Sequence, residues 1–365
     1  MSQLLETTLA HLRVLVAFDT RNPPRAIDGG GIFAWLRENL PGFDCRVTDH
    51  GAGAVSLLAI RGKPRLLFNV HLDTVPDSPH WSASPFELRV DGERAVGLGA
   101  CDIKGAAAAL VAAAQATHGD AAFLFTSDEE ANDPRCIAAF LAGPHAREFD
   151  GVVVAEPTRG EAVLAHRGIS SVLLRFRGQA GHASARQDAG ASALHQALRW
   201  GARALDQVDA LASERFGELS GLRFNVGRIE GGIKANVIAP EAELRFGFRP
   251  LPSMDVDALL AQFRALAPVA GSEFSETFRG PALPAGKPAQ AQGRHAQAQA
   301  LAASLGLPIG AAVDFWTEAA LFSQAGHTAF VFGPGDIAQA HSADEWVTLD
   351  QLHAYVNHVH RILQA

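Results

Sequence analysis

The stretch that most constrains the fold of this chain is a largely apolar run, Leu66–Val70, that ends at His71 and, two residues later, at Asp73. Such runs are typical of a strand buried on both faces, as in a parallel sheet covered by helices. Because residues i and i+2 of an extended chain point the same way, His71 and Asp73 share one side of the strand. A metal-bound imidazole usually donates its other N–H to a carboxylate, and Asp73 is placed to accept it. A single His-x-Asp is more often structural than metal-binding, so the metal-site interpretation depends on whether the pattern recurs.

Three further apolar runs are each followed by residues that can bind a metal ion. They are Ala121–Thr126, followed by Glu129 and Glu130; Val152–Ala155, followed by Glu156; and Thr328–Phe332, followed after a short loop by His341. Open α/β sheets bind ligands outside the carboxyl ends of their strands, so these side chains are expected at one edge. Asp102 joins them from a glycine-rich loop, Gly97–Gly105, that leads into an alanine-rich helix.

Two histidines, one aspartate and three glutamates gathered at one sheet edge need a counter-charge. Without one, the carboxylates repel each other and lose their hydration at a high cost in free energy. Divalent cations would neutralise them. Taken alone, Asp128–Glu130 is more typical of a solvated acidic turn, but the strand ends around it favour a metal site.

Composition limits the class of protein. A chain of 365 residues suits about two domains, and a content of 48% hydrophobic and 19% charged residues is that of a globular protein. The formal net charge of −8, with no basic block, argues against nucleic acid and anionic membranes as partners. Three scattered cysteines, Cys45, Cys101 and Cys136, fit a reducing cytoplasm, and we find no signal peptide or membrane span.

The pattern of elements changes near Gly168. Before it, strands alternate with helices, which predicts a mostly parallel, helix-covered sheet. After it, the partly alternating run Ser170–Arg177 begins a small α+β domain inserted into the first. The predicted domains are 1–167 plus 280–365 and 168–279. In the insertion we expect helices at 191–211 and 256–267 and strands at 222–229 and 242–249. After a linker at 280–292, we expect helices at 293–305 and 317–325 and strands at 310–313 and 328–332.

Motifs along almost the whole chain resemble the zinc-dependent, M20-type family of aminoacylases, acetylornithine deacetylases and succinyl-diaminopimelate desuccinylases. They are H-L-D-T-V-P at 71–76, G-x-G-x-x-D-x-K-G at 97–105, S-D-E-E at 127–130, A-E-P-T at 155–158, G-H-A-S at 181–184 and the late His341. Two positions depart from the family pattern: Ile103 replaces a common Met, and Glu318 replaces the Asp of other branches. The resemblance also implies a cis peptide bond between Asp102 and Ile103.

The resemblance implies a catalytic domain that binds one or two Zn²⁺ or Co²⁺ ions per subunit. Asp102 would bridge two ions. His71 and Glu156 would complete the ligands of the first ion, and Glu130 and His341 those of the second.

Other residues receive roles from the same resemblance. Glu129 would be the general base, and Asp73 would support the reaction beside His71. His182 would stabilise the oxyanion, from its own subunit or from the partner of a homodimer formed through the inserted lid or dimerisation domain. Asn236 and Arg249 would surround the substrate. From the residues alone, His182 is as readily a structural histidine and Arg249 a salt-bridged arginine.

The expected substrate is a small N-acyl amino acid. Segments 317–319 and 333–345 resemble the acetylornithine deacetylase branch, and within it we expect hydrolysis of N-acetyl-L-citrulline to citrulline and acetate, a step of arginine biosynthesis. N-acetyl-L-ornithine is the first alternative, followed by succinyl-diaminopimelate and dipeptides. A ligand-binding protein without catalysis is a further alternative, which the presence of every expected residue argues against.

Overall fold

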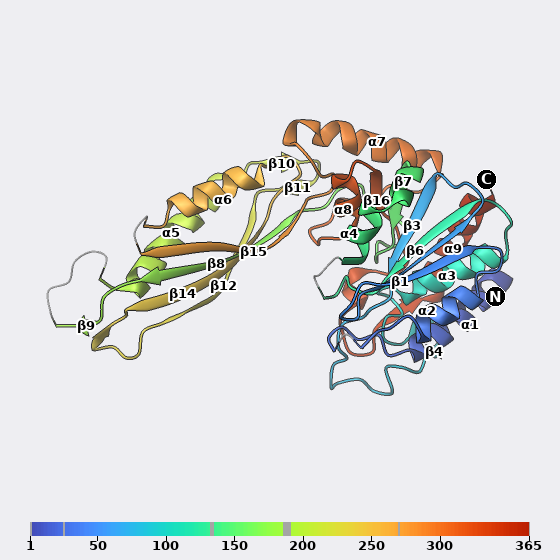
Figure 1. Cartoon of the computed structure of the whole chain (residues 1–365), viewed down its shortest axis with the longest axis horizontal. Helices are drawn as coiled ribbons and strands as arrows, with labels where there is room; N and C mark the ends of the chain where they lie inside the picture. The colour runs from blue at the N-terminus through green and yellow to red at the C-terminus, as the bar shows by residue number, and fades with distance from the viewer. Residues whose placement is uncertain (1, 25, 132–134, 185–190, 269–270, 365) are drawn as a thin grey trace. The chain divides into compact units, whose positions relative to one another are not determined.

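The chain forms two compact units. The computed structural model describes residues 2–24, 26–131, 135–184, 191–268 and 271–364. The first unit comprises Met1–Leu164, Arg294–Ala311 and Thr317–Ala365, and the second comprises Ala165–Gly293 and Ala312–Trp316. Figure 1 shows the helices and strands of both units.

A six-stranded sheet of order β1-β2-β6-β3-β7-β16 forms the centre of the first unit. Its strands are β1 (Asp44–Asp49), β2 (Val55–Arg61), β3 (Leu66–His71), β6 (Ala121–Thr126), β7 (Gly151–Val154) and β16 (Thr328–Val331). β6, β3, β7 and β16 run parallel, whereas β1 and β2 pair antiparallel at one side. The predicted mostly parallel sheet is confirmed.

Helices cover both faces of this sheet (Figure 1). They are α1 (Gln3–Ala17), α2 (Gly31–Glu38), α3 (Lys104–Gln115), α4 (Arg135–Ala142), α7 (Ala291–Ser304), α8 (Ala319–Gln324) and α9 (Leu349–Gln364). α3 is buried along almost its whole length, because its run of alanines allows α1, α9 and the sheet to approach closely. Among the described residues, no helix is long and apolar enough to cross a membrane.

The parallel strands bring distant parts of the chain to one edge. β3 ends at His71, β6 ends three residues before Glu129, and β7 ends two residues before Glu156. A small sheet of β4 (Arg89–Asp91), β5 (Arg94–Val96) and β17 (Trp346–Thr348) does the same for two loops. Because β5 pairs with β17, the loop that carries Asp102 lies beside the segment that carries His341.

The second unit is an α+β structure, as predicted. Its sheet has the order β12-β14-β8-β15, with β8 (Ile169–Arg177), β12 (Arg223–Gly231), β14 (Glu241–Arg249) and β15 (Ser272–Gly280). α5 (Ala193–Ala210) and α6 (Val256–Ala265) lie along the same face (Figure 1). Trp200 of α5 and Phe263 of α6 are fully buried against Phe246 of β14, and this aromatic core leaves the opposite face of the sheet uncovered by helices.

The structure divides the chain at different residues from those predicted. The segments that cross between the units pair with each other within the second unit, which therefore starts at Ala165 and includes 280–293 and 312–316. His166 and Leu283 exchange backbone hydrogen bonds of 2.9 and 3.0 Å, and the N–H of Val313 donates to the carbonyl of Ala165 at 3.1 Å. The predicted strand at 310–313 is therefore wrong, because this segment does not join the six-stranded sheet. The lid and dimerisation roles of the inserted domain stay predictions.

Candidate metal centre

The five predicted metal ligands lie together in the first unit. His71, Asp102 and Glu156 form one group of three, and Asp102, Glu130 and His341 form another. Within each group, one candidate ligand atom from each residue lies within 4.8 Å of the others. Asp102 belongs to both groups, so the two candidate sites share one carboxylate.

The two oxygens of Asp102 face different histidines. Asp102 Oδ1 lies 3.1 Å from His71 Nε2, and Asp102 Oδ2 lies 3.2 Å from His341 Nε2. Each imidazole also faces a glutamate: His71 Nε2 is 3.8 Å from Glu156 Oε1, and His341 Nε2 is 3.0 Å from Glu130 Oε1. The peptide bond between Asp102 and Ile103 is cis, as predicted.

Asp73 contacts one residue of each group. His71 Nδ1 lies 3.0 Å from the Asp73 carbonyl oxygen and 3.5 Å from Asp73 Oδ1. Asp73 Oδ2 accepts a hydrogen bond of 3.0 Å from the backbone N–H of Glu130 and one of 2.9 Å from the side-chain amide of Asn22. Asp73 therefore holds a residue of each group. Sequence reasoning missed Asn22, because the N-P-P segment indicates only where the first helix must end.

The carboxylates place both histidines in a strongly negative environment. Burial lowers the pKa of His71, but the hydrogen bonds with Asp102, Asp73 and Glu156 outweigh it and raise the pKa well above its usual value. Hydrogen bonds with Asp102 and Glu130 raise the pKa of His341 to about 11. Burial raises the pKa of Glu156 to about 7, because its charged form is poorly solvated. The two protonated imidazoles therefore place positive charge between the carboxylates of Asp102, Glu130 and Glu156.

Glu129 lies next to Glu130 and is only partly buried. Removal from solvent raises the pKa of its carboxyl group well above the usual value, and the charges of Glu156 and Glu130 raise it further, while that of His71 lowers it. A carboxylate with a raised pKa beside a group of metal-competent residues is suited to accepting and returning a proton. Its predicted role as general base is consistent with this environment.

Two buried glutamates near the centre were not among the predicted site residues. Glu318 is 1% exposed, and its Oε1 makes no hydrogen bond among the described residues. Burial and then the charge of Asp128 raise the pKa of Glu318 well above its usual value. Glu345 is 2% exposed and accepts hydrogen bonds from the backbone of the Asp102 loop. In the sequence, Glu318 stands out as a departure from the Asp of other branches, and Glu345 only as the last residue of the segment 333–345 that resembles the acetylornithine deacetylase branch.

The other predicted site residues lie in the second unit. His182 of β9 (Gly181–His182) is exposed, with Nδ1 2.7 Å from Ser184 Oγ. β9 pairs with β13 (Val237–Ile238), and the carbonyl of Asn236 accepts a 3.0 Å hydrogen bond from Ala183, so the structure brings His182 and Asn236 together. Arg249 lies at the far end of β14 from them.

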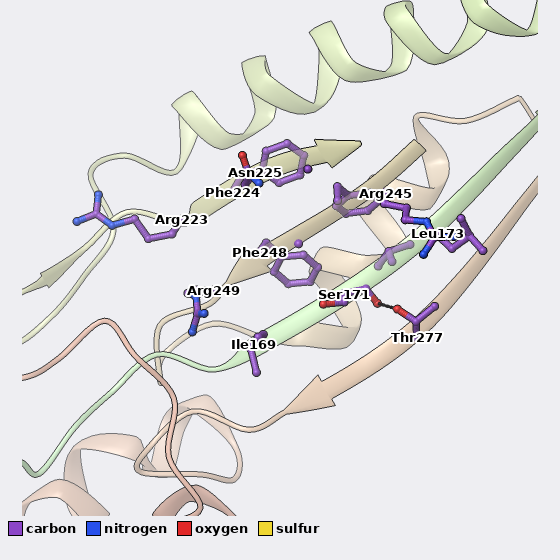
Figure 2. A pocket seen from close by; sticks show the side chains of 14 residues that line it. Ile169, Ser171, Leu173, Arg223, Phe224, Asn225, Arg245, Phe248, Arg249 and Thr277 are labelled. Atoms are coloured by element: carbon purple, nitrogen blue, oxygen red, sulfur yellow. Dashed lines mark hydrogen bonds between the residues drawn. The ribbon is translucent and has the colours of Figure 1, made fainter. Parts of the chain in front are cut away.

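Arg249 lines a pocket of about 510 Å³ on the helix-free face of the second unit's sheet. Figure 2 shows its side chain near Arg223, with Ser171 and Asn225 on the neighbouring strands and Arg245 further along β14. Partial burial lowers the pKa of Arg249. The nearby Asp314 forms its ion pairs with Arg167 and Arg223, and among the described residues Arg249 forms none.

Known proteins resemble this chain over most or all of its length. It is 68% identical over 364 residues to N-acetyl-L-citrulline deacetylase of Xanthomonas campestris pv. campestris. The matched residues cover 100% of this chain and 99% of that protein. It is 33% identical to acetylornithine deacetylase of Edwardsiella ictaluri, over 79% of this chain and 77% of that protein.

A solved structure shares the fold. The aminopeptidase PepT from Bacillus cereus superposes with a TM-score of 0.76 over 98% of each chain, at 18% sequence identity. Residues 67–365 match the sequence profile of peptidase family M20/M25/M40, and this stretch contains the strand ends, both groups of candidate ligands and the inserted unit. The chain is therefore a member of peptidase family M20/M25/M40.

Proposed function

We propose that this protein hydrolyses the N-acetyl amide of N-acetyl-L-citrulline, giving citrulline and acetate in arginine biosynthesis. The observation that carries the proposal is the identity of 68% to a protein of that activity across the whole chain. The geometry supports it, because the two groups of candidate ligands that share Asp102 are the arrangement expected of a metal-dependent amidohydrolase.

The donor atoms fit divalent cations. Two imidazoles and three carboxylates are ligands that suit both Zn²⁺ and Co²⁺. His71, Asp102 and Glu156 would hold one ion, and Asp102, Glu130 and His341 a second. The contacts of 3.0–3.8 Å between the histidines and the carboxylates support these positions, where a bound cation would take the place of the imidazole protons. Such ions, when bound, polarise the scissile carbonyl and make a water more acidic.

The protein's own groups move the proton and hold the geometry. Glu129 accepts a proton from the attacking water as its oxygen bonds to the acetyl carbon. It returns that proton to the amide nitrogen as the C–N bond breaks, so that the amino acid leaves as an amine. The water's second proton stays on the new carboxyl group and is lost as acetic acid ionises to acetate. Asp73 fixes His71 and the backbone of Glu130 while this happens.

Residues of the second unit are proposed to bind the substrate. His182 would donate a hydrogen bond to the acetyl oxygen as it becomes negative, from its own subunit or from a partner, and Asn236 would assist it. Arg249 would hold the α-carboxylate with two parallel hydrogen bonds. The support for Arg249 is its place in an open pocket without an acidic partner of its own.

We also propose a homodimer formed through the second unit. β12 is an edge strand of its sheet, and four exposed apolar side chains lie on it, just after it or on the adjacent α5. They are Leu198, Leu205, Ile229 and Ile233, which are 61%, 53%, 42% and 81% exposed. A twofold axis beside β12 would pair this edge with its copy and cover the apolar side chains.

A cytoplasmic location agrees with the cysteines. Cys45, Cys101 and Cys136 are free, and no disulfide forms among the described residues. Fractionation of the cells that make the protein would test this location, and recovery outside the cytoplasm would contradict it.

The first test compares the two acetylated substrates. N-acetyl-L-citrulline carries a neutral ureido group where N-acetyl-L-ornithine carries an ammonium group. With Co²⁺- or Zn²⁺-loaded protein, we expect kcat/KM for acetylcitrulline to exceed that for acetylornithine by about tenfold or more, since a site built for one polar group leaves unpaired atoms with the other. Acetate release measures both rates. A preference for acetylornithine would reassign the substrate, and no turnover of either would favour a ligand-binding protein.

Replacement of Glu129 tests the mechanism. Glu129→Gln removes the proton acceptor and keeps the volume, so kcat should fall by about 10²–10⁴-fold while the bound metal per protein is unchanged. Glu87→Gln, at an exposed position, serves as the matched control and should retain full activity. A parallel loss of metal and activity in Glu129→Gln would instead make Glu129 a ligand.

Metal binding should release protons. The pKa of His341 is about 11 and that of His71 is well above its usual value, so both imidazoles are protonated at neutral pH and must lose a proton to bind a cation. The apparent affinity for Co²⁺ should therefore rise between pH 6 and 8, by about tenfold per pH unit for each imidazole involved. Calorimetry in buffers of different ionisation heat counts the protons, and His341→Ala should release fewer. Affinity that does not change with pH would contradict the assignment.

The dimer is tested by adding a charge to its apolar surface. Ile229→Asp and Leu198→Asp should each shift the protein from dimer to monomer in analytical ultracentrifugation, because a carboxylate would be buried at the contact. Val90→Asp changes an equally exposed apolar residue of the first unit and should leave the dimer intact. A wild-type protein that sediments as a monomer would exclude this interface.

A further inference from the structure

Glu345 lies directly against the loop that carries Asp102. Its Oε1 accepts hydrogen bonds from the backbone N–H groups of Cys101 and Asp102, at 2.8 and 2.9 Å, and its Oε2 accepts one from Gly99 at 2.9 Å. One buried carboxylate thus binds three N–H groups of a four-residue stretch. One of these belongs to Asp102, whose side chain is shared by both groups of candidate ligands.

The same residue belongs to the segment that carries His341. The carbonyl of Glu345 accepts a 3.0 Å hydrogen bond from Gly97, and β17 begins at the next residue and pairs with β5. Side chain and backbone of Glu345 therefore bind opposite ends of the 97–102 loop. Glu345 therefore connects the loops of Asp102 and His341, next to the pairing of β5 with β17.

A buried carboxylate is costly unless its charge and its lone pairs are satisfied. The three N–H groups provide hydrogen bonds to both oxygens. Lys104, at the start of α3, is also fully buried, and its side-chain nitrogen donates a 2.9 Å hydrogen bond to the carbonyl of Phe18. Burial lowers the pKa of Lys104 to about 7. Both oxygens of Glu345 therefore have hydrogen-bond partners in the backbone of the loop that carries Asp102.

The two groups of candidate ligands depend to different degrees on the hydrogen bonds of Glu345. His71 ends β3 and Glu156 follows β7, so neighbouring strands of the main sheet fix their positions. His341 lies outside any helix or strand, with a left-handed φ of 53° and a side chain that is 49% exposed. Its distance from Asp102 is set by the loops that Glu345 connects.

We infer that Glu345 is a positioning residue that holds the Asp102 carboxylate in register with His341, so that the group of Asp102, Glu130 and His341 can bind a divalent cation. This inference rests on the proposed metal-dependent function. It assigns to Glu345 no contact with the substrate or with the cation itself.

The test separates the two groups before it removes Glu345. In His341→Ala protein only the group of His71, Asp102 and Glu156 (the His71 group) is complete. In His71→Ala protein only the group of Asp102, Glu130 and His341 (the His341 group) is complete. Glu345→Gln is added to each background, because glutamine keeps the volume but turns an NH₂ group toward an N–H donor and loses the charge. Metal-free proteins are titrated with Co²⁺ by calorimetry and by visible absorption, which reports the geometry of the bound ion.

In the His71→Ala background, Glu345→Gln should weaken Co²⁺ binding by about 10–100-fold, the usual effect of losing a residue that orients a ligand. In the His341→Ala background the loss should stay within about threefold, since the strand ends hold His71 and Glu156, two of the three ligands of that group. In the otherwise wild-type enzyme, kcat should fall while KM for the acetylated substrate is unchanged. Asp344→Asn is the matched control, because the neighbouring carboxylate binds Ser82 and Arg89 and should leave both affinities unchanged.

Equal weakening in both backgrounds, or a lower melting temperature with unchanged affinities, would overturn the inference by showing that Glu345 only stabilises the fold. Glu345→Asp keeps the charge but shortens the reach, and should give an intermediate loss in the His71→Ala background. If Glu345→Gln does not fold, Glu345→Asp replaces it in the same comparison of Co²⁺ affinities. If the unsubstituted protein neither binds Co²⁺ nor releases acetate, the proposed function itself is wrong and the inference fails with it.

Discussion

The structure depends on one carboxylate that serves two imidazoles. Asp102 presents one oxygen to His71 and the other to His341, two residues 270 positions apart in the sequence (341 minus 71). A carboxylate can take this place only if its backbone is fixed from behind. The glycine-rich loop, with Gly99 at a φ of 80° and no room for a side chain between Thr74 and Lys104, provides that fixed backbone. The neighbouring loops and α3 are arranged around this requirement.

Negative charge is the second constraint. Parallel strands carry Glu129, Glu130 and Glu156 to the same edge, and Asp73, Asp128, Glu318 and Glu345 are buried close by. Such a concentration is costly without positive charge among the acids, and the metal-free protein reduces the cost by protonating its histidines. Burial also raises the pKa of Glu156 and Glu318, which favours their uncharged forms. The same feature that makes the site costly to fold gives it a strong attraction for cations.

The sequence was sufficient for features that depend on local pattern. Apolar runs ending in acids and histidines predicted the parallel sheet and its edge, and the candidate ligands do lie together. β15 was missed because a register shift between Glu276 and Phe278 breaks its alternation. The unit boundaries were missed because they depend on pairings such as His166 with Leu283, which leave no periodic signal. The roles of Asn22 and Glu345 are set by which distant hydrogen-bonding groups face them, and no spacing rule encodes that.

The order of the candidate ligands along the chain has a consequence for biosynthesis. His71, Asp102, Glu130 and Glu156 are all translated within the first 156 residues, whereas His341 follows the whole inserted unit. β16 and β17, which flank His341 in the chain, emerge equally late. On the ribosome, the nascent protein therefore carries His71, Asp102 and Glu156 long before His341 is made. The group of Asp102, Glu130 and His341 is completed only after the inserted unit has been translated.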